Sequence, residues 1–190
     1  KDVEYVYLHS EGSLVSVDTY LSTYRDWRDT GLWPTSEKES QIRLDAAKKQ
    51  GNPLEKKGLL GAFCRCYSIT EAIAKFLPRV YEPTQVEGRY TYTEGSSVGG
   101  LVIYDNDTFA YSNHATDPIS GKLVNAFDLV RIHLFGAKDE GEDPATAVTK
   151  LPSYKAMIDF VNEDGAAPIL LDKERMADMD FEDITEDEDG

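Results

Sequence analysis

The chain has 190 residues, of which 41% are hydrophobic, and its 35 acidic and 20 basic side chains give a formal net charge of −15. This composition excludes full disorder, a collagen-like fibre and a disulfide scaffold. No apolar run approaches the roughly 18 residues that a membrane-spanning helix needs, so we expect no membrane partner.

Two helices are predicted in the first quarter of the chain. The first begins at Asp18 as its N-terminal cap and ends before Gly31. The second begins at Ser36, which forms a capping box with the glutamate three residues later, and it ends at Gly51. Ile42, Ala46 and Ala47 are expected to point inward in this second helix.

A third helix is predicted to begin at Ser68, where Glu71 completes another capping box, and to end at Pro78. Its apolar side chains recur at helical spacing and would form one buried face: Ile69, Ile73, Phe76 and Leu77.

The middle of the chain reads as β-structure. Residues 89–92 alternate like a short strand, and two apolar runs, 101–104 and 108–111, flank an Asp/Asn turn at 105–107. Two such runs joined by a turn of this composition predict a hairpin.

Further helices are predicted from Asn125 to Gly136 and from Ser153 to Gly165. The predicted class is therefore α+β, with a small antiparallel sheet that contains a hairpin at about residues 101–111 and is flanked by helices.

Charge is distributed unevenly along the chain. Residues 137–190 hold 17 acidic and 5 basic side chains, a net charge of −12, whereas Gln41 to Tyr90 holds nine basic and five acidic side chains, a net charge of +4. Composition divides the chain into four parts: an N-terminal helical segment (1–53), an α+β core (54–136), an acidic loop and helix leading towards the next domain (137–177), and an acidic tail or linker (178–190).

Cys64 and Cys66 are one residue apart, which is too close for a relaxed disulfide bond between them. Because these two cysteines are not expected to form a disulfide bond, we expect the protein to be located in a reducing cytoplasm.

Several short sequences occur in an order that points to a known family: Gly61-Ala-Phe-Cys-Arg65, Arg89-Tyr-Thr-Tyr92, Gly99-Gly-Leu-Val102, Phe109-Ala-Tyr-Ser112, Thr116-Asp-Pro118 and Asn125-Ala-Phe-Asp-Leu-Val130. The stretch from Leu54 to Phe135 resembles phage and prophage replication proteins of the virulence-associated protein E type, in which a primase-polymerase-like region precedes a ring-forming helicase. The family pattern favours Thr at position 66 and often His at position 113, where this chain has Cys66 and Asn113. The resemblance implies DNA replication in a bacterial host, with the primase-like and helicase domains as neighbours.

A metal site is one hypothesis for the chemistry of this region. Cys64, Cys66 and His114, with Asp117 as a fourth ligand, have an outline similar to the zinc ribbon of bacterial primases, where one ligand pair precedes a hairpin and the other follows it. Structural zinc prefers four Cys or His ligands with wider spacing than Cys64 and Cys66 provide. We therefore expect a degenerate ribbon without a cofactor, and bound zinc is the alternative.

Catalysis is a second hypothesis. Asp105 and Asp107, then Ser112 and His114, then Asp128 follow the order of the acidic pair, Ser-x-His and further acid of primase-polymerases, whose carboxylates hold two divalent ions. The competing interpretation places Asp105 and Asp107 in a turn and Asp128 in the first turn of a helix. We expect the turn and helix interpretation to hold, and we expect no catalytic residue in this segment.

The third hypothesis is contact with DNA or with a neighbouring domain. Basic residues of the core could contact phosphates: Arg65, Lys75, Arg79, Arg89 and Arg131. Tyrosines of the predicted strands could stack bases on one exposed sheet face, or could be packing residues instead: Tyr90, Tyr92, Tyr104 and Tyr111.

Together these patterns predict an accessory domain of a phage-type DNA primase–helicase that couples priming and unwinding and contacts single-stranded DNA weakly. We expect the parent protein to be an enzyme and this segment not to be one by itself. The alternatives are a primase catalytic fragment with metal-binding carboxylates and a purely structural docking or oligomerisation domain.

Overall fold

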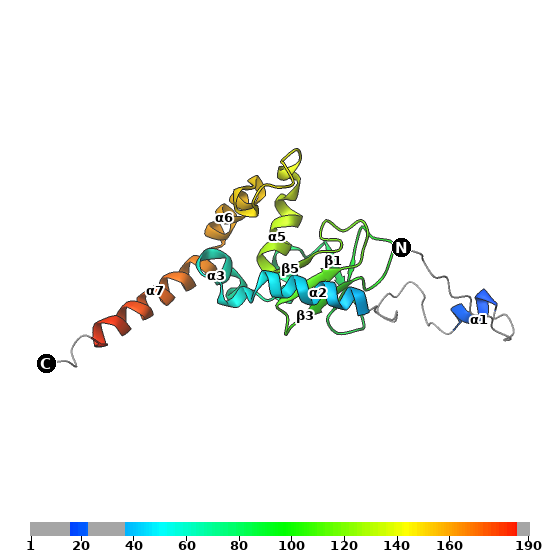
Figure 1. The fold of residues 1–190 in the computed structure, drawn as a ribbon, viewed down its shortest axis with the longest axis horizontal. Helices are drawn as coiled ribbons and strands as arrows, with labels where there is room; N and C mark the ends of the chain where they lie inside the picture. Colours follow the sequence, from blue (N-terminus) through cyan, green and yellow to red (C-terminus); the bar gives the residue numbers. More distant parts are fainter. Residues whose placement is uncertain (1–15, 23–36, 186–190) are drawn as a thin grey trace, which may run out of the picture.

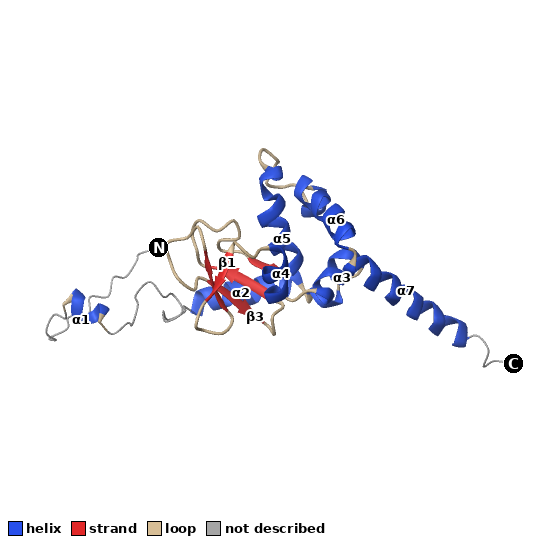
Figure 2. Ribbon diagram, turned by 180° about the vertical axis from the view of Figure 1, so that it is seen from behind, coloured by secondary structure: helices blue, strands red, loops and turns tan. Residues whose placement is uncertain are grey.

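The structure is a computed structural model that describes residues 16–22 and 37–185 (Figures 1 and 2). Its elements follow one another in the order α1 (Val17–Leu21), α2 (Glu37–Gln50), η2 (Pro53–Glu55), α3 (Gly58–Cys66), α4 (Ile69–Phe76), β1 (Tyr81–Pro83), β2 (Arg89–Tyr92), β3 (Leu101–Tyr104), β4 (Phe109–Ser112), β5 (Leu123–Asn125), α5 (Ala126–Phe135), η3 (Gly136–Asp139), η4 (Val148–Lys150), α6 (Pro152–Asp164) and α7 (Ala166–Thr185). Most of the first predicted helix, from position 23 on, lies outside the described residues.

The strands form one antiparallel sheet in which each strand pairs with the next along the chain, from β1 to β5. The predicted hairpin is β3–β4, where Leu101 lies opposite Ser112 and Tyr104 opposite Phe109. The α+β class with a small antiparallel sheet is confirmed, whereas β1 and β5, each three residues long, were not predicted.

The turn between β3 and β4 is held in an unusual conformation. Asp105, Asn106 and Asp107 all have positive φ values, of 52°, 52° and 66°. The carbonyl oxygen of Asp107 accepts a hydrogen bond from the backbone N–H of Ile69, and its Oδ1 accepts one from the N–H of Thr70. The turn is therefore anchored to the first turn of α4, whose free N–H groups it satisfies.

The predicted helix ends agree with the local hydrogen bonds. Ser68 and Glu71 form both bonds of the capping box of α4, and Asn125 accepts from the N–H of Asp128 at the start of α5. α6 ends at Gly165, which has a φ of 80°. These termini depend on hydrogen bonds within four residues, which explains why the sequence alone located them.

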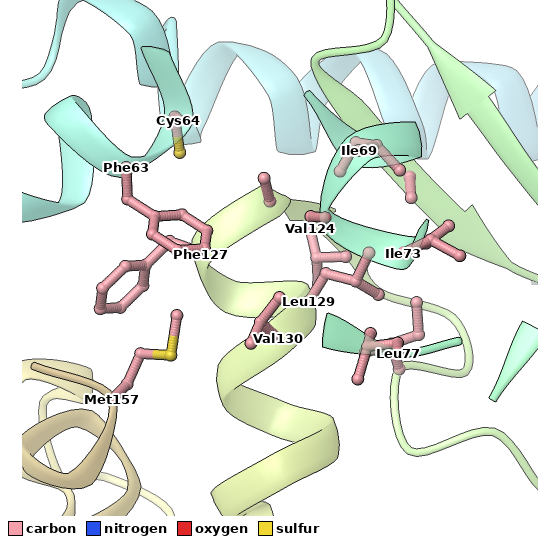
Figure 3. Packing of buried hydrophobic residues seen from close by; sticks show 14 of the residues in the cluster. Phe63, Cys64, Ile69, Ile73, Leu77, Val124, Phe127, Leu129, Val130 and Met157 are labelled. Carbon is pink, nitrogen blue, oxygen red and sulfur yellow. The ribbon is translucent and has the colours of Figure 1, made fainter. Parts of the chain in front are cut away.

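The hydrophobic core lies between the helices α3 to α6 and one face of the sheet (Figure 3). The rings of Phe63 and Phe127 pack edge to face with centroids 5.9 Å apart, and Met157 of α6 is fully buried. Each strand contributes one fully or almost fully buried side chain to this core: Tyr81, Tyr92, Leu101, Ala110 and Val124.

We expected residues 112–130 to pack on residues 61–77 and to bring Cys64 near His114. α3 and α4 do pack against α5, but Cys64 lies beside Asn125, whereas His114 contacts the loop between β2 and β3.

α2 runs across the other face of the sheet (Figures 1 and 2). Its Arg43 lies over the rings of Tyr104 and Tyr111. Ile42, which we expected to point inward, is 53% exposed, and this expectation was wrong. Ala46 and Ala47, which we also expected to point inward, are partly buried, and the cation Arg43 shares their side of the helix.

α7 begins against α3 and then projects away from the rest of the molecule (Figures 1 and 2). Ala167, near its start, is fully buried. We expected residues 178–190 to form a tail or linker, and the backbone of 178–185 instead continues α7. Among the residues that the structure describes, no helix is both long and apolar enough to cross a membrane.

Candidate functional site

His114 joins the two loops that flank the β3–β4 hairpin. Its Nε2 accepts hydrogen bonds from the backbone N–H groups of Tyr92 and Gly100, each at 3.1 Å, and its Nδ1 lies 2.7 Å from the Oγ of Ser97. An Nε2 that accepts from two donors carries no proton, so the ring is neutral and Nδ1–H donates to Ser97. One imidazole therefore holds residues 92–100 against the loop that follows β4.

The surrounding glycines make room for this ring. A Cβ at Gly100 would lie 2.7 to 2.8 Å from three ring atoms of His114, and a Cβ at Gly95 would lie 3.0 Å from its Nδ1. The ring is 2% exposed, and this burial lowers its pKa against the opposing effect of Asp117. No motif in the sequence connects Gly95 or Gly100 with His114.

A second buried polar group lies beside His114. The hydroxyl of Tyr81 donates to Oδ2 of Asp117 at 2.8 Å, and Nε2 of His133 lies 2.7 Å from the same hydroxyl and 3.4 Å from Oδ1 of Asp117. The ring of Tyr92 lies between the two histidines, with centroids 6.2 Å from His114 and 6.1 Å from His133. His133, in the last turn of α5, is thus a buried partner of Tyr81.

The ionisation of this second group is fixed by its hydrogen bonds. Burial acts to raise the pKa of Asp117, but hydrogen bonds from His133, the N–H of Ile119, Ser112 and Tyr81 outweigh it and hold the pKa low. Burial and the neighbouring carboxylate raise the pKa of Tyr81. Among the described residues, every buried side-chain nitrogen and oxygen has a hydrogen-bond partner, so the polar atoms of this cluster are satisfied within the fold.

The alternative zinc ligands do not come together. Cys64 and Cys66 lie two positions apart on α3 and so point in different directions. Cys64 is buried with Sγ 3.8 Å from Oδ1 of Asn125, and burial raises the pKa of its thiol to about 11. His114 faces the β2–β3 loop instead. In the described parts of the chain, no group of three or more His, Cys, Asp and Glu side chains could hold a metal ion.

The carboxylates of the alternative catalytic site serve the ends of helices. Asp107 accepts from the N–H of Thr70, and Asp128 accepts from Nε of Arg131 at 2.9 Å. Asp105 is exposed in the β3–β4 turn. These roles match the turn and helix interpretation of the sequence.

Three of the five candidate DNA contacts are engaged within the protein. Arg131 is 6% exposed and donates to Asp128 and to Oγ of Ser153. Arg65 donates twice to Glu174, at 2.7 and 2.6 Å, and also to the carbonyl oxygens of Leu54 and Lys56.

Lys75 binds Asp164 and the hydroxyl of Tyr67. Asp164 and the Tyr67 hydroxyl accordingly raise the pKa of Lys75, which is the third engaged base.

Arg79 and Arg89 remain accessible. Arg79 is exposed between α4 and β1, and Arg89 uses one guanidinium nitrogen for the carbonyl oxygen of Gly99. The strand register places Arg89 on the face that α2 crosses, together with Tyr104 and Tyr111. Among the five candidates, Arg79 and Arg89 are therefore the two whose guanidinium groups are open to a phosphate.

The four strand tyrosines do not share one face. Tyr90 and Tyr92 belong to the core face, whereas Tyr104 and Tyr111 lie on the opposite face. The expectation of a single face with four tyrosines was wrong, because the β2–β3 connection pairs Tyr90 with Leu101 and so sets the two pairs out of phase.

Comparison with known proteins found no family model, no curated protein and no solved structure that matches this chain.

Proposed function

We propose that this chain is a non-catalytic accessory segment of a phage-type DNA primase–helicase, which acts in DNA replication and connects the priming and unwinding parts. Most of the short sequences that carry the resemblance to virulence-associated protein E fall on α3, the strands β2 to β4 and the start of α5, and Thr116-Asp-Pro118 lies in the loop between β4 and β5. The resemblance therefore extends over several elements of the folded core.

The observation that carries the proposal is the link made by His114. In a primase-type zinc ribbon, a metal joins a loop before a hairpin to a loop after it. Here the loops before and after β3–β4 are joined by one neutral imidazole, through the N–H groups of Tyr92 and Gly100. This arrangement supports a degenerate ribbon-like core in which hydrogen bonds take the place of the metal.

A non-catalytic role is supported by what the carboxylates do. Asp107 and Asp128 are occupied at the N-termini of α4 and α5, and two-metal catalysis requires carboxylates that are free to bind both ions. Mixing the chain with primed template, nucleotides and Mg²⁺ or Mn²⁺ should therefore give no incorporation. Incorporation that is lost in both Asp105→Ala and Asp128→Ala would establish the catalytic alternative.

Weak contact with single-stranded DNA is supported by Arg79 and Arg89 and opposed by the acidic C-terminal region. For two phosphate contacts at a slope of about −0.7 each, affinity should fall by about sevenfold between 50 and 200 mM salt. Fluorescence anisotropy on a labelled oligonucleotide should show this dependence, and Arg89→Ala should weaken binding for every base sequence. Lys122→Ala removes an exposed charge from the β4–β5 loop and serves as the control. No binding by the intact chain even at low salt would refute the DNA contact.

A docking domain is the second candidate, and α7 favours it. This helix projects from the body and exposes Ile169 and Met176 by 58% and 66%. Failure to bind DNA combined with concentration-dependent association in light scattering would favour this candidate over the first.

A further inference from the structure

The sheet face that lies away from the helical core has side chains suited to a single strand of nucleic acid. The register places Arg89, Val102, Tyr111 and Leu123 in one row across β2 to β5, and Tyr104 lies in the adjacent row. All five side chains are partly exposed. A guanidinium group next to aromatic rings combines phosphate contact with base stacking.

α2 covers this face through one cation. Arg43 donates a hydrogen bond to the hydroxyl of Tyr104, and its guanidinium carbon lies 4.6 Å from the centroid of that ring and 5.9 Å from the ring of Tyr111. At the end of the helix, Gln50 donates to the carbonyl oxygen of Leu123 at 3.1 Å. The guanidinium plane thus occupies the position over Tyr104 that a stacked base would take.

Apolar packing contributes little to this contact. Ile42 and Leu44 are 53% and 56% exposed, although a helix held by apolar burial would turn such residues towards the sheet. A hollow of about 190 Å³ remains between helix and sheet, lined in part by Ala47 and Leu123. The interaction is polar and local, so a ligand that offers stacking and charge of its own can replace it.

Resting on the proposed DNA contact, we propose that α2 is a strap that occupies the single-stranded DNA site of this sheet face and is displaced when DNA binds. The rows that hold Tyr104 and Tyr111 contain the cation Arg89, and the acidic residues of this face, Glu82 and Asp105, lie at its edges, which favours a polyanion as the occupant of the centre. Stacking on these rings requires unpaired bases, which selects single-stranded over double-stranded DNA.

Two variants of the full chain separate strap release from simple loss of charge. Arg43→Ala and Lys49→Ala each remove one positive charge from α2, but only Arg43 touches the tyrosines. Anisotropy with a labelled oligothymidine at low salt should show about three- to tenfold tighter binding for Arg43→Ala and equal or weaker binding for Lys49→Ala. Tyr111→Ala should weaken DNA binding both in the unmodified chain and in Arg43→Ala. Tyr111→Phe keeps the ring and should bind DNA as tightly as the chain with Tyr111.

Hydrogen exchange gives a readout that does not depend on affinity. Saturating oligothymidine should speed exchange of the α2 amides in the unmodified chain and leave those of α5 unchanged. If the unmodified chain binds DNA but Arg43→Ala binds equally or more weakly, or if DNA protects α2, the strap is refuted and the DNA contact stands. If neither the unmodified chain nor Arg43→Ala binds, the DNA contact and the strap are both refuted.

Discussion

Arg65 of α3 and Glu174 of α7 form a two-pronged ion pair, with Nε and a terminal nitrogen of the arginine donating to the two carboxylate oxygens. The remaining terminal nitrogen of Arg65 binds the carbonyl oxygens of Leu54 and Lys56. One guanidinium therefore connects three segments and sets the direction in which α7 leaves the body. An arginine predicted to bind DNA serves instead to hold α7 against α3.

Removing this ion pair should loosen α7 without unfolding the core. Both side chains are partly exposed, so the pair contributes about 1 kcal/mol and not more. Arg65→Ala should speed hydrogen exchange in the first turns of α7 by about fivefold. Arg175→Ala breaks only the exposed contact to Asp172 and should leave exchange unchanged. Equal effects of the two variants would show that α7 is not held by Arg65.

The fit between Gly100 and His114 predicts strong coupling of their substitutions. Gly100→Ala should lower the free energy of unfolding by about 1–3 kcal/mol, because the new methyl group overlaps the imidazole. His114→Ala should lower it by about 2–4 kcal/mol, since it leaves a cavity and two unsatisfied N–H groups. The double variant should lose clearly less free energy of unfolding than the sum of the two single losses.

Urea unfolding of the four proteins measures this coupling. Gly136→Ala is the matched control, because a Cβ there has only an ordinary contact, at 3.7 Å from Ile132, in helical backbone. Additive effects of Gly100→Ala and His114→Ala would contradict the contact.

The free energy of unfolding should decrease as the pH falls below the ordinary pKa of histidine. The native pKa of His114 is lowered, whereas the unfolded chain takes up its proton near pH 6.5. Below about pH 6.5 the unfolded state therefore binds more protons, and the free energy of unfolding declines until the native pKa is reached. Urea unfolding between about pH 7.5 and 5.5 should show this decline, and His114→Gln should flatten it.

The two cysteines should differ in reactivity. With a pKa of about 11, the thiol of Cys64 is ionised to only about one part in a thousand at pH 8, and it is buried as well. A thiol reagent should label Cys66, which is partly exposed, and should reach Cys64 at a comparable rate only after denaturation. Rapid labelling of Cys64 in folded Cys66→Ser would contradict its placement.

Arg131 should contribute to the stability of the fold and not to DNA binding. It is buried between Asp128, Asp139 and Ser153, and its removal leaves two carboxylates without their cationic partner. Arg131→Met should therefore cost about 3–5 kcal/mol in thermal or urea unfolding. Arg79→Met, at an exposed site, should cost less than about 0.5 kcal/mol. If Arg131→Met stays as stable as the unmodified chain yet binds DNA less well, this assignment is wrong.

Features that depend on neighbouring residues could be predicted from the sequence. The caps at Ser68 and Asn125 and the turn at Asp105–Asp107 use hydrogen bonds between residues close in the chain or familiar turn chemistry. β1 and β5 could not be predicted in this way, since strands of three residues are too short to show an alternating pattern.

The candidate site depends on residues far apart in the sequence. Tyr81 and His133 are 52 residues apart, and Ser97 meets His114 only after the sheet has formed. The sequence indicates that His114 and Asp117 are chemically notable. It pairs them with Cys64 and Cys66, however, because those side chains resemble metal ligands. The deciding factor is the sheet register, which the sequence does not encode locally.

The central claim is that a neutral histidine joins the loop before β3 to the loop after β4 through hydrogen bonds. Long-range nitrogen–proton correlation NMR reads the protonation of both imidazole nitrogens of His114 directly. We predict a proton on Nδ1 and none on Nε2, with a spectrum that a metal chelator leaves unchanged. A proton on Nε2, or a His114 signal that shifts when a chelator is added, would contradict the claim.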